Sequence, residues 1–190
     1  MLAALRPAAV MILVFTLITG AAFPLLFTAV GHLALPFQSD GSLVVRNGQV
    51  IGSAIIGQNF TSDKYFHGRP SALMGTDPKD SSKQIPTPYD ASESGASNLA
   101  PTSKALIDRI TGDTKSAMPI DAVTSSGSGL DPDISPANAL QQAARVARAR
   151  HLPLAQVQAL VAAHTEQPLL GFIGEPRVNV LAANLALDTK

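Results

Sequence analysis

Residues 7–35, PAAVMILVFTLITGAAFPLLFTAVGHLAL, form the stretch that decides the architecture of this chain. No Asp, Glu, Lys or Arg occurs between Arg6 and Asp40. A helix of about 29 residues is roughly 43 Å long, whereas the hydrocarbon core of a bilayer is about 30 Å thick. The stretch therefore predicts one transmembrane helix, with tilt or a non-spanning turn at one end. Pro24 removes a backbone hydrogen bond and predicts a kink within the helix.

Two alternatives to a membrane anchor fit part of this pattern. A secretory signal could be cleaved near Gly20-Ala21-Ala22, but the apolar run continues to Leu35, beyond the usual length of a signal sequence. A buried core helix is disfavoured because no polar residues mark a side that faces solvent. We therefore expect an uncleaved anchor. Thr16 and Gly20 are among its small or weakly polar residues, which are typical of contacts between transmembrane helices.

The charges on either side of the helix predict its orientation. Arg6 and the α-amino group precede the helix, while Asp40 and Arg46 follow it. The positive-inside rule then favours a cytoplasmic N-terminus. We expect residues 1–6 in the cytoplasm, residues 7–35 across the bacterial inner membrane, and residues 36–190 as one soluble extracytoplasmic domain.

The composition excludes several functional classes. The chain has 190 residues, a net charge of zero and 15% charged residues, so it lacks the basic surface of a nucleic-acid binder. It contains no Cys, which excludes disulfides, thiolate metal sites and a cysteine nucleophile. Its four histidines have no metal-ligand spacing, and no phosphate-binding P-loop or nucleophile elbow is present. We therefore expect no metal site, no catalytic residues and no independent enzymatic activity.

The soluble part predicts an α/β (α+β) domain with a small sheet and a helical hairpin. Asn47-Gly48 between β-branched runs predicts a β-hairpin whose second strand continues to Ile56. Ser135-Pro136 is a specific helix start, and a break at Leu152-Pro153 opens a second helix. Inward positions are expected at Leu140, Ala143, Ala144, Ala147, Leu154, Val157, Leu160 and Val161.

Other segments are expected to form less regular structure. We predict a short helix over residues 101–110, a strand over residues 120–124, and either a strand or a helix in the tail at 177–188. From residue 65 to about residue 100 the sequence is rich in Gly, Pro, Ser and Asp, which predicts a long loop that is flexible over residues 72–93. The Ser125–Gly129 run favours a turn with necessary glycines over an anion-binding nest.

Four polar residues share one arc of the helix that starts after Ser135. They are Asn138, Gln141, Arg145 and Arg148, at roughly 100° per residue. The arc contains no Asp or Glu that would compensate the arginines along the helix. It is either a solvated face or a docking surface on which Arg supplies planar donors to a partner protein.

Read in order, the segments closely resemble one family, the C subunit (KdpC) of the Kdp-type potassium-transporting ATPase. The resemblance covers nearly the whole chain and rests on the order and spacing of several stretches. These stretches are Ile55-Ile56-Gly57-Gln58-Asn59-Phe60, Tyr65-Phe66-His67-Gly68-Arg69-Pro70-Ser71, Ser94 to Leu99, Ser125 to Pro136, Ala144 to Arg150, and Gly171-Phe172-Ile173-Gly174-Glu175-Pro176-Arg177-Val178-Asn179-Val180-Leu181 with Asn184 to Asp188.

The resemblance implies a non-catalytic accessory subunit of a high-affinity, ATP-driven potassium uptake complex in the inner membrane. Its partners would be a channel-like potassium-binding subunit, a P-type ATPase subunit and a small single-helix subunit. The family is described as a catalytic chaperone that raises the ATP affinity of the ATPase subunit. A Ser-Gly-rich loop of the family has been likened to a nucleotide-binding signature, which implies Ser94, Gly95, Ser97 and Asn98 as nucleotide contacts here.

The expected location of the domain argues against direct ATP binding, because a domain outside the cytoplasm meets no ATP. Coupling through helix packing or assembly is then the expected route, and we expect no firmly bound cofactor. Candidate partner contacts are Gln58, Arg69, Asn138, Gln141, Arg145 and Arg148. The alternative from another functional class is a stand-alone, membrane-tethered module that binds a small solute at Gln58, Arg69 and Asn98.

Overall fold

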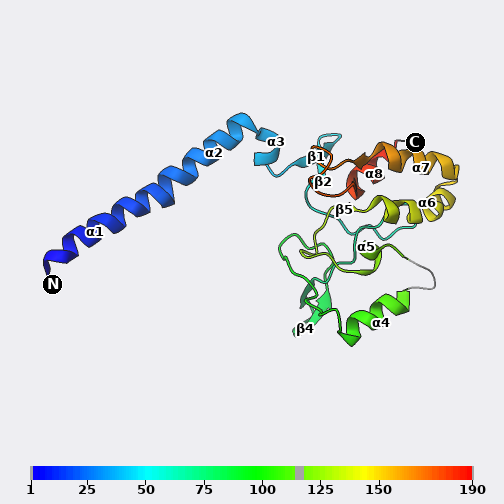
Figure 1. Cartoon of the computed structure of the whole chain (residues 1–190), viewed down its shortest axis with the longest axis horizontal. Coiled ribbons are helices and arrows are strands. Elements are labelled where there is room, and N and C mark those ends of the chain that lie inside the picture. The colour runs from blue at the N-terminus through cyan, green and yellow to red at the C-terminus, as the bar shows by residue number, and fades with distance from the viewer. Residues whose placement is uncertain (1, 114–117, 190) are drawn as a thin grey trace. The chain divides into compact units, whose positions relative to one another are not determined.

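The computed structural model describes residues 2–113 and 118–189. The chain divides into two units, residues 1–51 and residues 52–190, which are described separately. The first unit is dominated by one apolar helix, and the second contains the helices and strands that build a folded domain (Figure 1).

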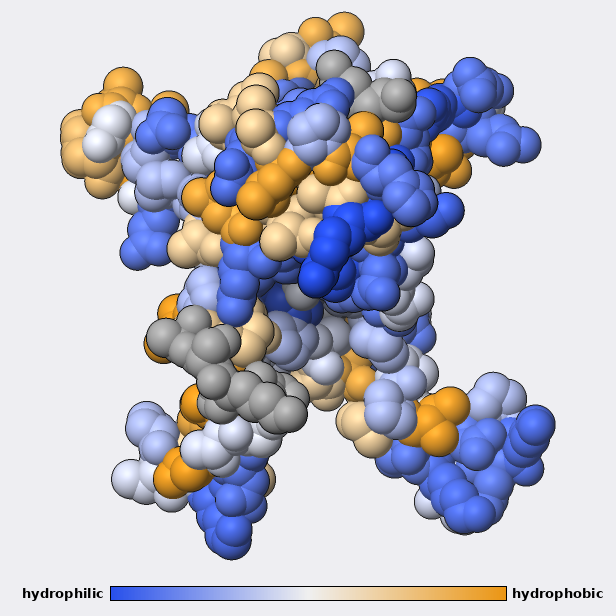
Figure 2. Space-filling view, turned by 90° about the vertical axis from the view of Figure 1, so that its right-hand side faces the viewer, coloured by the Kyte–Doolittle hydropathy of each residue, from blue (hydrophilic) through white to orange (hydrophobic). Residues whose placement is uncertain are grey.

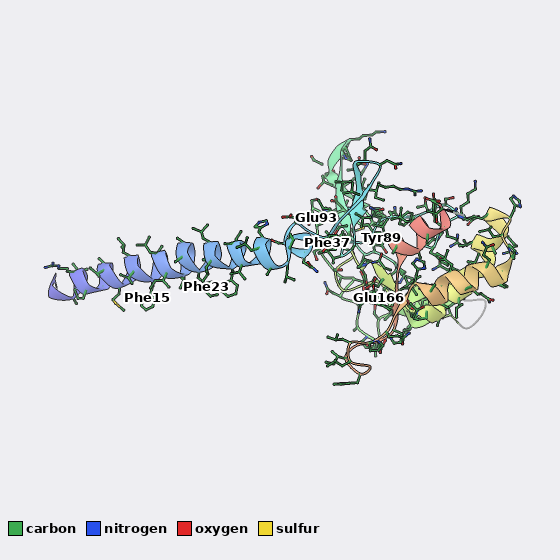
Figure 3. The ribbon with its side chains drawn as sticks, turned by 90° about the horizontal axis from the view of Figure 1, so that it is seen from above. Phe15, Phe23, Phe37, Tyr89, Glu93 and Glu166 are labelled. Atoms are coloured by element: carbon green, nitrogen blue, oxygen red, sulfur yellow. The ribbon has the colours of Figure 1, made fainter. Side chains whose placement is uncertain are left out.

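The apolar helix is continuous from α1 (Leu2–Leu17) through the π-helical turn η1 (Ile18–Ala22) to α2 (Phe23–Ala34). Its apolar span, Ala4–Ala34, has 31 residues, and the most apolar 18-residue stretch of the span has a mean hydropathy of 2.4 and buries nothing within the chain. Phe15 and Phe23 project outward from it in Figure 3. This is one helix long and apolar enough to cross a membrane, as the sequence predicted.

A π-helical turn directly precedes Pro24, where the sequence predicted a kink, and the kink itself stays a prediction. Pro24 has no N–H group, and its ring would clash with the carbonyl group four residues earlier in a regular α-helix. In η1 the backbone hydrogen bonds join residues five apart rather than four. The Phe23 amide, for example, donates to the Ile18 carbonyl oxygen. The Thr19 hydroxyl also donates to the Phe15 carbonyl oxygen at 2.7 Å.

After the helix, α3 (Pro36–Ser39) leads into a hairpin of β1 (Leu43–Arg46) and β2 (Gln49–Ser53). Asn47 and Gly48 have φ angles of +53° and +78°, so the predicted two-residue turn is confirmed. The predicted extension of the second strand to Ile56 is wrong. The strand ends at Ser53, and a tight turn follows, in which Ser53 pairs with Ile56 as an isolated bridge.

The domain of residues 52–190 contains short elements joined by long irregular segments. They are β3 (Met74–Asp77), β4 (Asp80–Pro86), α4 (Lys104–Asp113), α5 (Ile120–Val123), β5 (Asp133–Ile134), α6 (Pro136–Arg150), α7 (Leu154–Ala163), β6 (Thr165–Glu166), β7 (Arg177–Asn179) and α8 (Val180–Leu187). The central β7 strand pairs antiparallel with β5 and with β6, and β3 pairs antiparallel with β4. The predicted α/β domain with small sheets is therefore present.

The helical hairpin α6–α7 is confirmed, and its core face differs in part from the prediction. The Ser135 hydroxyl accepts from the Asn138 amide, and Pro136 occupies the first turn, as the sequence indicated. Ala143, Ala147, Val157, Leu160 and Val161 are buried, but Leu140 and Leu154 are 46% and 43% exposed and Ala144 is also exposed. On α6 the polar Asn138 occupies the buried face instead, because it has hydrogen-bond partners there.

Three other segments differ from their predictions. The strand predicted over residues 120–124 is wrong. Ile120–Val123 form the helical turn α5, because Asp121 binds the start of α6 and the Thr124 hydroxyl donates back to the Ile120 carbonyl oxygen. The predicted helix at 101–110 begins three residues later, at Lys104. The segment 72–93 contains the β3–β4 hairpin rather than loop alone, while its flexibility stays a prediction.

The tail uses both of the structures that its sequence left open. Arg177–Asn179 form β7, and Val180–Leu187 form α8, with the Asn179 side chain accepting from the Ala182 amide at the junction. The helix packs into the domain core with Phe66, Ile134 and the buried faces of α6 and α7. The C-terminal end of the chain is thus part of the core rather than an appendage.

Candidate functional site

The main groove of the domain lies beside α6. It has a volume of about 700 Å³ and opens widely to solvent. The residues that line it come from the segments 59–61, 67–71 and 88–89, from Met118 and Ala122, and from Asn138, Gln141, Gln142 and Arg145 on α6. The groove therefore gathers Arg69 with three of the four residues of the predicted polar arc.

Arg145 is held by residues 63–65, which lie in the sequence between two of the segments that line the groove. Its guanidinium donates to the carbonyl oxygens of Asp63 at 2.8 Å and of Tyr65 at 3.0 Å, and to Gln142 Oε1 at 2.8 Å. The Asp63 carboxylate lies 3.5 Å away, and burial lowers the pKa of Arg145 while Asp63 opposes that shift. The polar arc itself contains no acidic residue, and the acidic partner of Arg145 comes from a distant segment of the chain. Arg145 thus orders residues 63–65.

Asn138 belongs to a second network, with Asp121 and Ser135. Its side chain is 2% exposed and donates to Asp121 at 3.1 Å, while the Ser135 amide and hydroxyl donate to the same carboxylate at 2.7 and 2.9 Å. Burial would raise the pKa of Asp121, but these hydrogen bonds lower it. Asn138 therefore stabilises the start of α6 and is too buried to contact a partner protein directly.

Gln142 joins these networks to the backbone of His67. Its Oε1 accepts from the His67 amide at 2.8 Å, and its Nε2 donates to the His67 carbonyl oxygen at 3.0 Å and to Asn138 Oδ1 at 2.9 Å. Burial lowers the pKa of His67, which favours the neutral imidazole. Gln142 was not predicted from the sequence, although its position four residues after Asn138 places both on one helix face.

Arg69 also lines the groove, and its guanidinium already has partners within the domain. It pairs with Asp131 at 3.0 Å and reaches Thr124 and the Ser125 carbonyl oxygen. The Tyr89 hydroxyl donates to the Arg69 carbonyl oxygen at 2.7 Å, and burial raises the pKa of Tyr89 to about 12. The Nε–H of Arg69 is buried without a hydrogen-bond partner. Arg69 and Tyr89 together hold the 67–71 segment against the 124–131 loop.

The Ser94 loop does not line this groove. Ser94 and Asn98 are exposed, Gly95 and Ser97 are half-buried, and the Gly95 amide donates to the Ser128 carbonyl oxygen at 2.9 Å. Asn98 has a φ of +51°. Because the Gly95 amide is used within the domain, it is not directed at a phosphate. Gln58 is also absent from the groove lining, so the three residues of the predicted solute site do not come together there.

Gln141 and Arg148 are the members of the predicted arc that remain at the surface. Both side chains are exposed, on the α6 face that also carries the exposed Leu140. Within residues 2–113 and 118–189, no group of three or more His, Asp or Glu side chains is placed to hold a metal ion. The polar residues of the groove thus form hydrogen bonds within the domain and order its loops. Leu140, Gln141 and Arg148 form an exposed surface next to them.

Comparison with known proteins identifies the group to which these features belong. A sequence model of the KdpC family, described as the K⁺-transporting ATPase c chain, matches residues 5–189. The chain is 56% identical to the potassium-transporting ATPase KdpC subunit of Rhodopseudomonas palustris strain CGA009. It is 55% and 54% identical to the KdpC subunits of Bradyrhizobium diazoefficiens and Methylobacterium nodulans. Each match covers 99% of this chain and 98% of the relative.

Proposed function

The chain belongs to the KdpC family, and we propose that it is the accessory subunit of a high-affinity, ATP-driven potassium uptake complex. The observation that carries this proposal is the family match over residues 5–189, which includes both the apolar helix and the domain. In this role the chain stabilises assembly and raises the ATP affinity of the P-type ATPase subunit, as a catalytic chaperone without catalysis of its own. Its partners are that subunit, a channel-like potassium-binding subunit and a small single-helix subunit.

The apolar helix supports membrane assembly with these partners. In the chain by itself its side chains contact no apolar surroundings, so lipid or other transmembrane helices must cover them. We propose that the helix crosses the inner membrane once with its N-terminus in the cytoplasm. Arg6 in the first turns of the helix and the scarcity of basic residues directly after the helix support this orientation.

The proposed orientation places the domain outside the cytoplasm, where it would cap the external face of the potassium-binding subunit. An effect on ATP affinity then reaches the ATPase subunit indirectly, because the domain contacts two states of the complex differently. The internal hydrogen bond of Gly95 is consistent with an indirect effect rather than with a phosphate contact at Ser94, Gly95, Ser97 and Asn98. Gln141 and Arg148 are the exposed candidates for contacts with a partner.

A stand-alone solute-binding module is the weaker candidate. The groove is large enough for a small solute, but Arg69 and Arg145 already donate to groups of the domain itself. A solute with a carboxylate or phosphate would have to displace these bonds. The groove is therefore better suited to order loops than to bind an anion.

Two experiments test the proposal. In the first, the full chain with a C-terminal tag is co-expressed with the other subunits and purified in mild detergent. We expect multi-pass partners to co-purify, and we expect the complex to hydrolyse ATP with a lower KM for ATP than the same subunits without this chain. The exchange Arg148→Ala should weaken recovery, whereas Gln158→Ala, on the exposed surface of α7, is the matched control. An isolated monomer, or an unchanged KM for ATP, would contradict the corresponding part of the proposal.

The second experiment uses the absence of cysteine from the sequence. The exchange Ser94→Cys places one thiol on the exposed loop, and Leu2→Cys places one at the N-terminal end of the apolar helix. A membrane-impermeant maleimide added to intact spheroplasts should label Cys at position 94 and not at position 2. Labelling of position 2 alone would reverse the orientation and bring the Ser94 loop into contact with cytoplasmic ATP.

A further inference from the structure

A short turn at residues 168–173 carries an apolar surface that the domain does not use. Leu169, Leu170, Phe172 and Ile173 are 68%, 75%, 76% and 50% exposed. In Figure 3 the loop that follows Glu166 extends away from the rest of the domain, and Figure 2 shows an orange lobe that projects at the upper left. Isolated exposed apolar residues are common, but four neighbouring ones mark a surface for interaction.

The shape of this turn is fixed by its own backbone. Leu169 and Ile173 form a bridge in which each amide donates to the other's carbonyl oxygen, at 3.1 and 3.0 Å. The Gly171 amide donates to the Pro168 carbonyl oxygen at 2.9 Å. The turn therefore presents its side chains in a defined arrangement without support from the domain core.

Leu170 carries a conformational cost in this arrangement. Its φ is +55°, in the left-handed region that a bulky side chain rarely adopts, whereas Gly171 at +81° has no such cost. Asn would fit the angle of Leu170 better, and it would also be better solvated. A strained, exposed Leu at the tip of a turn contributes nothing to the stability of the domain, so its apolar side chain is better explained by contact with another molecule.

The charges around the turn distinguish between the molecules that could cover it. Residues 167–174 carry no charge, and Glu166 and Glu175 flank them. The nearest Lys or Arg along the sequence, Arg177, is paired with Glu166 at 2.7 Å and with Asp133 at 3.2 Å. Loops that enter a bilayer surface usually carry unpaired Lys or Arg for the anionic headgroups. Acidic flanks without such residues favour an apolar pocket on a protein, with a neutral or basic rim.

We propose that residues 168–173 form a docking turn, whose Leu170 and Phe172 insert into an apolar pocket on the extramembrane surface of another subunit of the same ATPase. This inference rests on the proposed function, which supplies the partner. Phe and Leu in a fully desolvated pocket typically provide a large share of the binding energy of an interface. The docking turn would hold the domain against its partner at a point that is independent of the transmembrane helix.

Crosslinking of the assembled complex tests which molecule covers the docking turn. Phe172 is replaced by p-benzoylphenylalanine in the full chain, and Ile107, which is 48% exposed on α4, is replaced in the same way as a control. Irradiation should join position 172, and not position 107, to another subunit of the ATPase. Adducts only with lipid, adducts only with a second copy of this chain, or no adduct at position 172 would each overturn the inference.

Two substitutions separate docking from folding. Leu170→Asn combined with Phe172→Asn should reduce the recovery of the other subunits at least tenfold, while Ile107→Asn leaves recovery unchanged. Leu170→Asn alone should leave the urea midpoint of the domain unchanged or raise it, because Asn suits the positive φ. Recovery of the double variant at the wild-type level would overturn the docking turn. If the wild-type chain itself recovers no partner, the proposed function fails, and the two failures are thus distinguishable.

Discussion

The apolar helix and the domain of residues 52–190 are stabilised in opposite ways. The helix, Ala4–Ala34, satisfies its own backbone hydrogen bonds but leaves its side chains exposed. The domain buries a core of modest size, and much of its chain has no regular secondary structure. In the domain, side chains supply hydrogen bonds that strands or helices would otherwise provide.

The two regions depend on different properties of the sequence. The helix requires an apolar environment and tolerates many apolar sequences. The domain requires particular polar side chains, among them Gln142 and Asn184, each of which binds both the N–H and the C=O of one distant residue. Exchanges between apolar residues should therefore be mild in the helix, whereas replacement of these polar side chains by apolar ones of similar size should be severe in the domain. Unfolding of the domain can be followed separately, because both tyrosines, Tyr65 and Tyr89, lie in it and the chain has no Trp.

The largest effect is expected from Asn184→Leu. Asn184 is 2% exposed, accepts from the Phe66 amide at 2.8 Å and donates to the Phe66 carbonyl oxygen at 3.0 Å. Leu has a similar size but leaves both backbone groups buried without partners, at a cost of about 4 kcal/mol in unfolding free energy. Urea unfolding of the full chain in mild detergent, followed by tyrosine fluorescence, measures this loss. Gln158→Leu, an exposed site on α7, is the control and should shift the midpoint little.

The next largest effect is expected in the helix, from a substitution that should leave the stability of the domain unchanged. Leu17→Lys places a charge near the middle of the apolar span, which disfavours membrane insertion by about 3 kcal/mol. We expect less of the variant to resist alkaline extraction from membranes, whereas Leu17→Ala should be retained like the wild type. Tyrosine-monitored unfolding of the domain should be the same for all three proteins. A shift of that transition by Leu17→Lys would show that the two regions are not independent.

The sequence predicted the helix better than the domain for a physical reason. A run such as residues 7–35 contains its own evidence, because its length and lack of charge are local properties. The Asn47-Gly48 turn and the Ser135-Pro136 helix start are equally local, and both are confirmed. In the domain, Arg145 binds residues about 80 positions earlier in the chain, and Asn184 binds Phe66 at a separation of 118 residues. No periodicity within a segment reveals such pairs.

The candidate site was likewise only partly predictable from the sequence. The polar arc of α6 was visible as a pattern, but helix geometry alone cannot distinguish a surface residue such as Arg148 from a buried one such as Asn138. Leu140 illustrates the converse, because an apolar residue at a helix position predicted to be inward is 46% exposed. The docking turn could have been noticed from the uncharged apolar run at 168–173, but its exposure required the structure.

A smaller effect is expected in the Ser125–Gly129 turn, where two glycines can be compared directly. Gly129 has a φ of +73°, and a Cβ there would lie 2.5 Å from Leu73 Cγ, whereas a Cβ on Gly127 would meet nothing within 4 Å. Gly129→Ala should therefore reduce the unfolding free energy by about 2 kcal/mol, and Gly127→Ala should change it by less than about 0.5 kcal/mol. Equal effects of the two substitutions would contradict the role of Gly129 as a structural turn residue.

The smallest effect is a change in how stability depends on pH. The hydrogen bonds from Ser135 and Asn138 lower the pKa of Asp121 below its ordinary value of 3.8, although burial opposes them. A carboxylate whose pKa is lower in the folded state adds stability above its unfolded pKa, and the chain loses that stability as the pH falls through the folded pKa. Asp121→Asn removes this contribution, so the variant should be less stable than the wild type at pH 7. The difference should shrink as the pH falls below 3.8.

Urea midpoints of both proteins between pH 7 and pH 2.5 measure this convergence. Asp108→Asn serves as the control for the change in net charge, because that carboxylate is exposed on α4 and pairs only with Lys104, four residues earlier, among the ion pairs of the described chain. Curves for Asp121→Asn and the wild type that stay parallel to pH 2.5 would show that the Asp121 hydrogen bonds do not favour the charged form. Convergence would establish that the start of α6 is stabilised by a specific carboxylate, in contrast to the helix of residues 4–34, which has no charged residue other than Arg6.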